Sequence, residues 1–226
     1  MDATLISSIT PLGDQAALVS CPNEEAALTV TQAIRTLGVS WLIDVVQAYT
    51  TVAVYFDLGQ IRFADVSTTL ANIQPAKQST QPRRSHIIPC CYDFELDLKR
   101  VCDHTGLNTE DVIRLHTGCE YTVYAIGFCP GFPYLGYLPA ELTGLPRLER
   151  PRVRVEAGTV GLTGRQTGIY TLDRPGGWNL IGKTPLELVN VADEYFPLRV
   201  GDRVRFQRID EAEFAKLKGE RLLVVD

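Results

Sequence analysis

The chain has 226 residues and a mass of 25.0 kDa, with 45% hydrophobic and 22% charged residues, which excludes a disordered or low-complexity protein. Its 22 Lys and Arg against 27 Asp and Glu give a net charge of −5, the opposite of the balance typical of a nucleic-acid binder. No apolar run approaches the roughly 20 residues of a membrane helix, and no secretory signal opens the chain, so we expect a cytoplasmic protein that binds neither nucleic acid nor membranes.

Residues 1–80 are predicted to form a small N-terminal α+β domain. The apolar residues of 27–37 and of 63–73 recur at helical spacing, whereas those of 52–56 alternate as in a strand. Residues 4–9 and 15–20 predict a strand pair around a turn at 11–14. This order favours a sandwich in which the helices cover one face of an antiparallel sheet.

A second domain is predicted over residues 85–226, after a polar, proline-containing linker at 74–84. The apolar spacing of Phe94, Leu98, Val101 and Cys102 predicts a short helix that Gly106 terminates, and Asn108 can cap a second helix over Thr109–His116. Short alternating strands follow at 122–126, 152–156 and 203–207, with Gly and Pro turns between them, and a last helix begins at Asp210. These patterns favour a β-barrel or sandwich.

Residues 127–185 carry an unusual share of the residues that build binding sites. They hold 11 of the 18 Gly and 7 of the 13 Pro, aromatic residues crowd their start, and basic residues outnumber acidic ones from 145 onward. Glycine lets the backbone approach a ligand, aromatic rings form rigid walls, and arginine binds carboxylate or phosphate. Barrel turns, an aromatic core and exposed arginines explain the same composition, so both interpretations stay open.

Four motifs in this region carry a resemblance to a known family. They are Gly-Phe-Cys-Pro-Gly-Phe-Pro-Tyr-Leu-Gly at 127–136, Arg-Pro-Arg-Val-Arg-Val-Glu-Ala-Gly-Thr-Val-Gly at 150–161, Gly-Arg-Gln-Thr-Gly-Ile-Tyr at 164–170 and Pro-Gly-Gly-Trp-Asn-Leu-Ile-Gly-Lys-Thr-Pro at 175–185. In this order they resemble the 5-oxoprolinase B-subunit family, which includes the sporulation-kinase inhibitor of bacilli and is also described as allophanate hydrolase subunit 1. Two features depart from the family pattern: Glu156 replaces a more usual proline, and the stretch 91–97 is shorter.

The resemblance implies a fold, an activity and partners. The fold is a small N-terminal α/β domain followed by a cyclophilin-like β-barrel domain. The activity is that of a non-autonomous member of an ATP-dependent complex, which opens 5-oxo-L-proline to L-glutamate together with the A and C subunits, the latter of antagonist type. The alternatives are a regulatory protein that inhibits a sporulation-type histidine kinase, and one half of a urea- or allophanate-type amide carboxyltransferase or hydrolase. ATP is the implied cofactor, yet no phosphate-binding motif with its lysine is present, so the sequence does not locate its site.

His116 and Arg154 are the candidate catalytic residues. His116 ends a predicted helix, where it can serve as a general base or as a cation at the helix terminus. Arg152 and Arg154 alternate with valines and are therefore predicted to share one strand face, from which they can clamp a substrate carboxylate, with Arg152 assigned to binding. Surface decoration is the alternative for both arginines.

Further substrate-binding candidates come from the aromatic and glycine-bounded motifs, and they are Phe128, Phe132, Tyr134, Gln166, Thr167, Tyr170 and Trp178. Trp178 is expected as a pocket wall or core residue. Cys129 is a weaker candidate nucleophile because no neighbouring His and acid are readable in the sequence. The six cysteines show no metal-finger spacing, so no metal is predicted, and they are expected to be reduced thiols.

Overall fold

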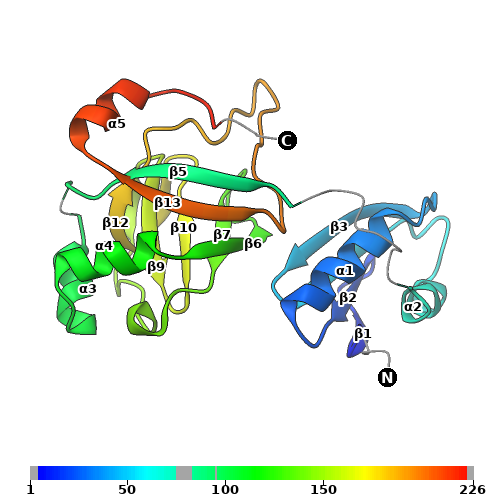
Figure 1. The fold of residues 1–226 in the computed structure, drawn as a ribbon. Helices are drawn as coiled ribbons and strands as arrows, with labels where there is room; N and C mark the ends of the chain where they lie inside the picture. Colours follow the sequence, from blue (N-terminus) through cyan, green and yellow to red (C-terminus); the bar gives the residue numbers. More distant parts are fainter. Residues whose placement is uncertain (1–4, 75–82, 95, 223–226) are drawn as a thin grey trace. The chain divides into compact units, whose positions relative to one another are not determined.

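The structure is a computed structural model that describes residues 5–74, 83–94 and 96–222. The chain divides into two compact units, Met1–Pro82 and Arg83–Asp226, each with its own hydrophobic core (Figure 1). Most of the predicted linker, and residue 4 of the first predicted strand, lie outside the described residues. Among those that are described, no helix is long and apolar enough to span a membrane.

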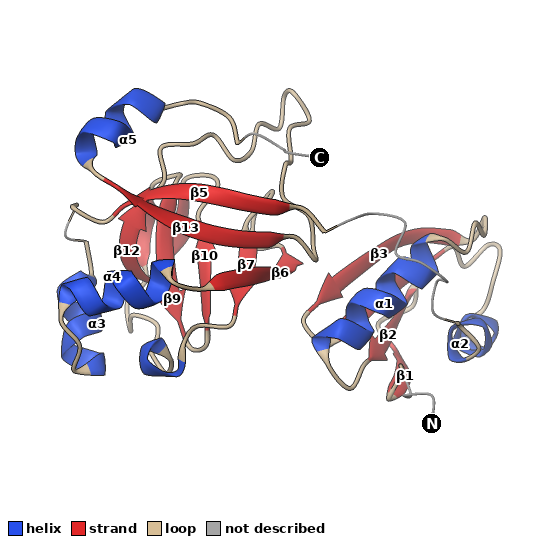
Figure 2. Cartoon of the chain, in the orientation of Figure 1, coloured by secondary structure: helices blue, strands red, loops and turns tan. Residues whose placement is uncertain are grey.

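The N-terminal unit is an antiparallel sheet with two helices, as predicted (Figure 2). The sheet order is β1-β2-β4-β3, and every neighbouring pair is antiparallel. The elements are β1 (Ser8–Pro11), β2 (Ala16–Ser20), α1 (Glu24–Arg35), β3 (Leu42–Ala48), β4 (Thr51–Phe56) and α2 (Phe63–Ala71).

Both predicted helices form, and each ends before the last of the apolar residues whose spacing predicted it, Leu37 and Ile73. The Asn23 side chain accepts a hydrogen bond from the Ala26 amide and so caps α1 at its start. At the other end, the Thr36 hydroxyl donates to the Ala33 carbonyl, and α1 stops there rather than at Leu37. Val30 and Ile34 of α1 are fully buried in the core of this unit, and each contributes roughly 1.5–3 kcal/mol of hydrophobic stabilisation.

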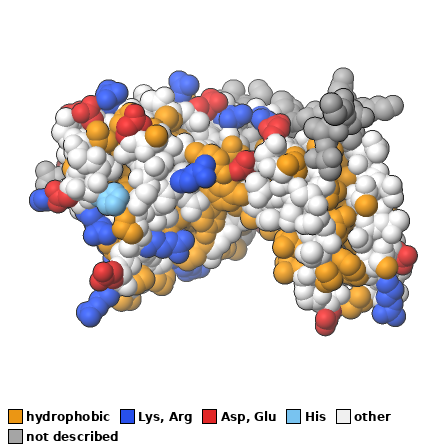
Figure 3. All heavy atoms as spheres, turned by 90° about the horizontal axis from the view of Figure 1, so that it is seen from below, with side chains coloured by type: hydrophobic (Ala, Val, Ile, Leu, Met, Phe, Trp, Pro, Cys, Tyr) orange, Lys and Arg blue, Asp and Glu red, His pale blue; other side chains and the backbone are white. Residues whose placement is uncertain are grey.

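Apolar side chains also reach the surface of this unit (Figure 3). The large exposed ones are Leu12, Ile43, Val46 and Tyr55. In β3 and β4, residues such as Val45 and Val54 point toward the helices, whereas Val46 and Tyr55 occupy the alternating positions of the other face.

The second unit is built on a closed seven-stranded barrel. Its strand order is β6-β13-β5-β12-β9-β10-β7, and β7 also pairs with β6, which closes the sheet on itself. Strands β5 and β13 run parallel, and the other pairs are antiparallel. The strands are β5 (Ser85–Cys91), β6 (Glu120–Ile126), β7 (Pro133–Gly136), β9 (Thr159–Thr163), β10 (Gln166–Ile169), β12 (Asn179–Lys183) and β13 (Arg203–Ile209). The predicted fold class, an α+β unit followed by a β-barrel, is confirmed.

Helices and a small ribbon complete this unit: α3 (Leu98–Thr105), α4 (Thr109–Thr117), η1 (Ala140–Leu142), α5 (Glu211–Leu217), and the antiparallel strands β8 (Arg152–Val155) and β11 (Arg174–Gly176). The predicted caps are confirmed, since Gly106 ends α3 in the left-handed region at φ 75° and the Asn108 side chain caps α4. Phe94 was predicted in the α3 stripe, but it lies before that helix and packs its ring 5.1 Å from Phe214 of α5.

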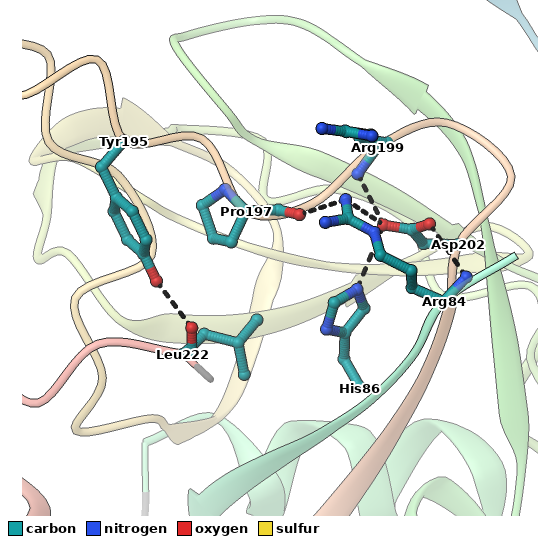
Figure 4. Close-up of polar contacts among 7 residues, drawn as sticks. All are labelled: Arg84, His86, Tyr195, Pro197, Arg199, Asp202 and Leu222. Carbon is teal, nitrogen blue, oxygen red and sulfur yellow. Dashed lines mark hydrogen bonds and ion pairs between the residues drawn. The ribbon is translucent and has the colours of Figure 1, made fainter. Parts of the chain in front are cut away.

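A buried carboxylate fastens the start of the parallel pair β5–β13 (Figure 4). Asp202 accepts hydrogen bonds from the Arg84 guanidinium at 3.1 Å, from the Arg199 amide at 2.9 Å and from His86 Nε2 at 3.1 Å. Burial acts to raise the pKa of Asp202, but the bonds from His86 and Arg199 and the charge of Arg84 outweigh it, so the pKa is lowered. Asp202 is therefore ionised in the folded protein at neutral pH.

Candidate functional site

Five of the predicted binding residues form one group, in which four aromatic rings surround the ring of Phe132. Phe132 lies 4.9 Å from Tyr134, 5.3 Å from Tyr170, 5.4 Å from Phe128 and 5.5 Å from Trp178, measured between ring centroids. Three of the four motifs contribute to this group, which we call the aromatic cluster. The structure therefore brings together residues that lie up to 50 positions apart in the sequence, from 128 to 178.

The aromatic cluster is a small packed core rather than an open pocket. Phe132 is 1% exposed, Tyr170 1% and Trp178 5%, and they pack with Cys129, Val155 and Leu180. Burial raises the pKa of the Tyr134 and Tyr170 hydroxyls, and the positive charge of Arg147 acts against this rise. Arg147 is exposed and was not among the candidates, although its place in the basic stretch after residue 145 signalled it.

The glycines of these motifs are explained by this packing. A Cβ on Gly168 would lie 3.0 Å from both the Phe132 and Trp178 rings, and one on Gly176 would lie 2.2 Å from the Tyr170 hydroxyl oxygen. Glycine is required at both positions because the backbone of each glycine lies directly against an aromatic side chain of the same protein, which leaves no room for a Cβ. The predicted close approach of backbone to a ligand is thus a close approach to the aromatic cluster.

Phe128 is the member of the cluster that faces solvent. It is 58% exposed, and its backbone has φ 64°, an unfavourable region for a bulky residue. The Cys129 amide donates to the Gly127 carbonyl at 2.7 Å, so Phe128 is the central residue of a three-residue turn. A strained turn that holds a large apolar ring in water is a recurrent property of functional loops.

His116 lies in the barrel core and not in the aromatic cluster. Its ring is fully buried, with Nδ1 2.8 Å from the Tyr92 hydroxyl and Nε2 3.0 Å from Thr167 Oγ1. Because the Thr167 hydroxyl donates to the Gly161 carbonyl, Nε2–H donates to Thr167 and the Tyr92 hydroxyl donates to Nδ1.

Burial lowers the pKa of His116 to about 3, so the ring is neutral at pH 7 and the interpretation as a cation at the helix end is wrong. A general base must touch its substrate, and a side chain without exposed surface does not do so in this conformation. The catalytic role stays a prediction, and so does the binding role of the equally buried Thr167.

The two candidate arginines do not share one strand face. Val153, between them, is 91% exposed, so the predicted alternation fails at this ribbon, where the pairing of β8 with β11 shifts register. Arg152 binds Asp97 at 2.6 Å and the Trp178 carbonyl at 3.3 Å, whereas the exposed Arg154 binds Asp173 at 2.6 Å. Each guanidinium is thus engaged by a carboxylate of this chain.

Gln166 lies at the opposite end of β10 from Tyr170. Four residues of extended strand separate the two positions by about 13 Å, so the structure does not bring Gln166 into the aromatic cluster. Cys129 is buried, with its sulfur 3.6 Å from Thr171 Oγ1. In the described part of the chain, no group of three His, Cys, Asp or Glu side chains is placed to hold a metal ion.

A pocket of about 540 Å³ lies next to the aromatic cluster. Thr171 and Leu172 belong to its lining, and the Thr171 hydroxyl donates to the Pro130 carbonyl of the first motif at 2.7 Å. Lys183 and Glu156 also line the pocket and form an ion pair of 2.5 Å. None of the predicted site residues lines it. The sequence analysis noted Glu156 only as a departure from the family pattern and did not single out Lys183.

Comparison with known proteins shows the family of this chain. The family model described as carboxyltransferase domain, subdomain C and D, matches residues 7–198. The 5-oxoprolinase B subunit of Bacillus subtilis (strain 168) is 39% identical over 196 residues, which cover 79% of this chain and 80% of that protein.

Two solved structures share the fold. The protein TTHA0988 matches with a TM-score of 0.75 at 34% identity over 87% of this chain and 40% of its own, so the present chain spans less than half of that longer one. The Kluyveromyces lactis urea carboxylase matches with a TM-score of 0.71 over 97% of this chain and 25% of its own, and its 16% identity supports the fold alone. The chain therefore belongs to the family of carboxyltransferase subdomains C and D and, within it, to the 5-oxoprolinase B-subunit proteins.

Proposed function

We propose that this chain is the B subunit of an ATP-dependent 5-oxoprolinase, which opens 5-oxo-L-proline to L-glutamate together with the A and C subunits. The observation that carries the proposal is the similarity to the 5-oxoprolinase B subunit of Bacillus subtilis, which is 39% identical to this chain over 80% of the B subunit's length. The four motifs lie in the same barrel unit, and three of them meet in the aromatic cluster.

The chain acts as one part of a shared active site. A self-sufficient amide hydrolase needs a nucleophile, a base and a group that orients the base. Among the described residues, Cys129 has no histidine within hydrogen-bond distance, and His116 bonds to Tyr92 and Thr167 in the core. The contribution of this chain is therefore to bind and orient substrate, and its partner subunits supply the remaining groups.

The glycine-rich motifs do not fit a nucleotide phosphate. A phosphate loop offers free backbone N–H groups at the start of a helix. Here residues 159–169 form the β9–β10 hairpin, whose amides serve the strand ladder, and Gly161 and Gly168 pack against Trp178 and Phe132. We therefore assign ATP binding to another member of the complex.

Reconstitution tests the proposal. The purified chain should show no 5-oxoproline-dependent ATP hydrolysis, and addition of the A and C subunits should yield L-glutamate with ATP consumption. Phe128→Ala should lower turnover of the complex, because its exposed ring is the solvent-facing part of the aromatic cluster. Val191→Ala, at a residue equally exposed but outside the four motifs, should leave turnover unchanged.

Two results would count against this function. Robust ATP-dependent activity of the isolated chain would contradict the shared site. Recovery of a histidine kinase instead of the C subunit in co-purification would favour the regulatory alternative, and turnover of urea but not of 5-oxoproline would favour the carboxyltransferase alternative.

A further inference from the structure

The 540 Å³ pocket has the size and construction of a small-molecule site. Ligand pockets commonly occupy about 300–1,000 Å³. Five segments of the barrel unit line it: Phe94, residues 156–158, residues 171–172, residues 183–189 from the last residue of β12 onward, and the C-terminal part of α5 with the two residues that follow it. Much of the lining is apolar, and it includes Phe94, Leu172, Leu186, Val189 and Phe214.

The pocket contains an ion pair in which the lysine, Lys183, is the more buried partner and the carboxylate, Glu156, is the more exposed one. The Lys183 side chain is 23% exposed, whereas that of its partner Glu156 is 61% exposed. Lys183 Nζ lies 5.7 Å from the centre of the Phe94 ring, at the apolar wall. Because solvent screens an ion pair with one partner this exposed, the pair contributes little to stability, and another carboxylate can replace Glu156 at little cost.

The other ionisable groups also favour an anion. Glu187 lines the pocket, but its carboxylate is engaged by Arg221 at 2.8 Å and by Asn190 at 2.9 Å. Lys218 lines the pocket as a second cation, and within residues 83–94 and 96–222 no carboxylate forms an ion pair with it. With Glu156 displaced, the pocket presents two lysines above an apolar wall.

We propose that this pocket binds a small carboxylate with an apolar ring or chain, and that the ligand carboxylate takes the place of Glu156 on Lys183. The apolar body then lies against Phe94, Phe214 and Leu172. The identity of the ligand as 5-oxo-L-proline, a lactam ring bearing one carboxylate, rests on the proposed function, whereas the carboxylate class rests on the pocket alone. Lys183 is thus the binding cation, a role that the motif pattern predicts for Arg152 and Arg154.

Calorimetric titration of the full chain tests this proposal with three probes. They are 5-oxo-L-proline, 2-pyrrolidinone as the same ring without a carboxylate, and cyclopentanecarboxylate as a ring carboxylate without the lactam. Both carboxylates should bind, and 2-pyrrolidinone should bind at least tenfold more weakly, because it lacks the carboxylate that accepts a charge-assisted hydrogen bond from Lys183.

Variants at the ion pair give opposite expectations. Lys183→Met should weaken carboxylate binding at least tenfold, and Glu156→Gln should strengthen it, because the competing carboxylate is gone. Lys216→Met, on α5 outside the pocket lining, is the matched control and should bind like the parent. The Glu156→Gln result keeps the test decisive if Lys183→Met does not fold.

Each outcome decides one part of the proposal. Binding of cyclopentanecarboxylate without binding of 5-oxo-L-proline would overturn the ligand identity and support the carboxylate site. Absence of both, or unchanged affinity in both Lys183→Met and Glu156→Gln, would overturn the site itself. A complex that lacks 5-oxoprolinase activity while the isolated chain binds carboxylates would refute the proposed function and leave the pocket assignment standing.

Discussion

Replacing Gly168 by alanine tests whether the motif glycines serve internal packing. The new Cβ would lie 2.9 Å from the Pro133 carbonyl oxygen and 3.0 Å from Phe132 Cζ and Trp178 Cζ3. The Pro133 carbonyl belongs to β7, which is paired with β10 at this position, so it cannot retreat without disturbing the ladder. Overpacking of this kind costs about 1–3 kcal/mol in the free energy of unfolding.

Gly177→Ala is the matched control, because its Cβ would find its nearest neighbour, the Leu148 carbonyl oxygen, at an ordinary 3.6 Å. Both substitutions remove the same flexibility from the unfolded chain, an effect of about 0.4–1 kcal/mol that cancels in the comparison. We therefore expect Gly168→Ala to be about 1–3 kcal/mol less stable than Gly177→Ala.

Urea denaturation measures this difference, followed by the fluorescence of Trp178 in a Trp41→Phe background. Trp41 and Trp178 are the chain's two tryptophans, so the signal then reports on the barrel unit. Equal denaturation midpoints for the two alanine variants would refute the packing explanation and return these glycines to ligand binding.

Three further predictions concern ionisable groups. Burial lowers the pKa of His116 to about 3, so the unfolded chain, with its histidine near ~6.5, takes up the proton first. The contribution of His116 to stability should therefore be full above pH ~6.5 and fall by up to about 1.4 kcal/mol per pH unit as the pH drops toward the folded-state pKa of about 3. His116→Gln should remove this slope, and the exposed His104→Gln should keep it. Asp202→Asn should cost about 3–5 kcal/mol and speed amide exchange in β13, because the largely buried Arg84 guanidinium loses its counter-charge and His86 loses its carboxylate acceptor. Unchanged exchange would contradict this. Arg154→Ala should change stability by less than about 1 kcal/mol and leave kcat/KM of the complex unchanged, since its ion pair is exposed; a tenfold loss would establish the arginine clamp.

Local signals in the sequence predicted most of the fold. Asn23 was not identified, but Asn108, Gly106 and Asp210 were placed correctly at helix ends, because caps depend on residues within one turn. The alternation of 52–56 likewise predicted β4, whose inward residues are fully buried. Phe94 was misassigned because its partner, Phe214, lies 120 positions away in the sequence, beyond any local pattern.

The site was less predictable for a physical reason. The sequence motifs identified the aromatic residues that form the aromatic cluster. A glycine that packs against a ligand and a glycine that packs against an aromatic ring look the same in a sequence, so the motifs did not distinguish a binding site from a packed core. The alternation of Arg152 and Arg154 indicated one face, and the register shift in the β8–β11 ribbon separates them. Lys183 could be singled out only with its neighbours in space, because its importance comes from apolar side chains and from Glu156, which segments far apart in the sequence bring to the pocket.

The position of β13 has a consequence for how the chain reaches its native state. This strand lies beyond residue 198, where the family match ends, yet it pairs with both β5 and β6 and completes the barrel. It leaves the ribosome more than a hundred residues after β5, whereas every strand pairing of the N-terminal unit is complete within residues 8–56. Synthesis at about 5–20 residues per second leaves β5 and β6 with open edges for several seconds. A fragment cut at residue 198 would keep those edges permanently, and we expect it to aggregate rather than fold.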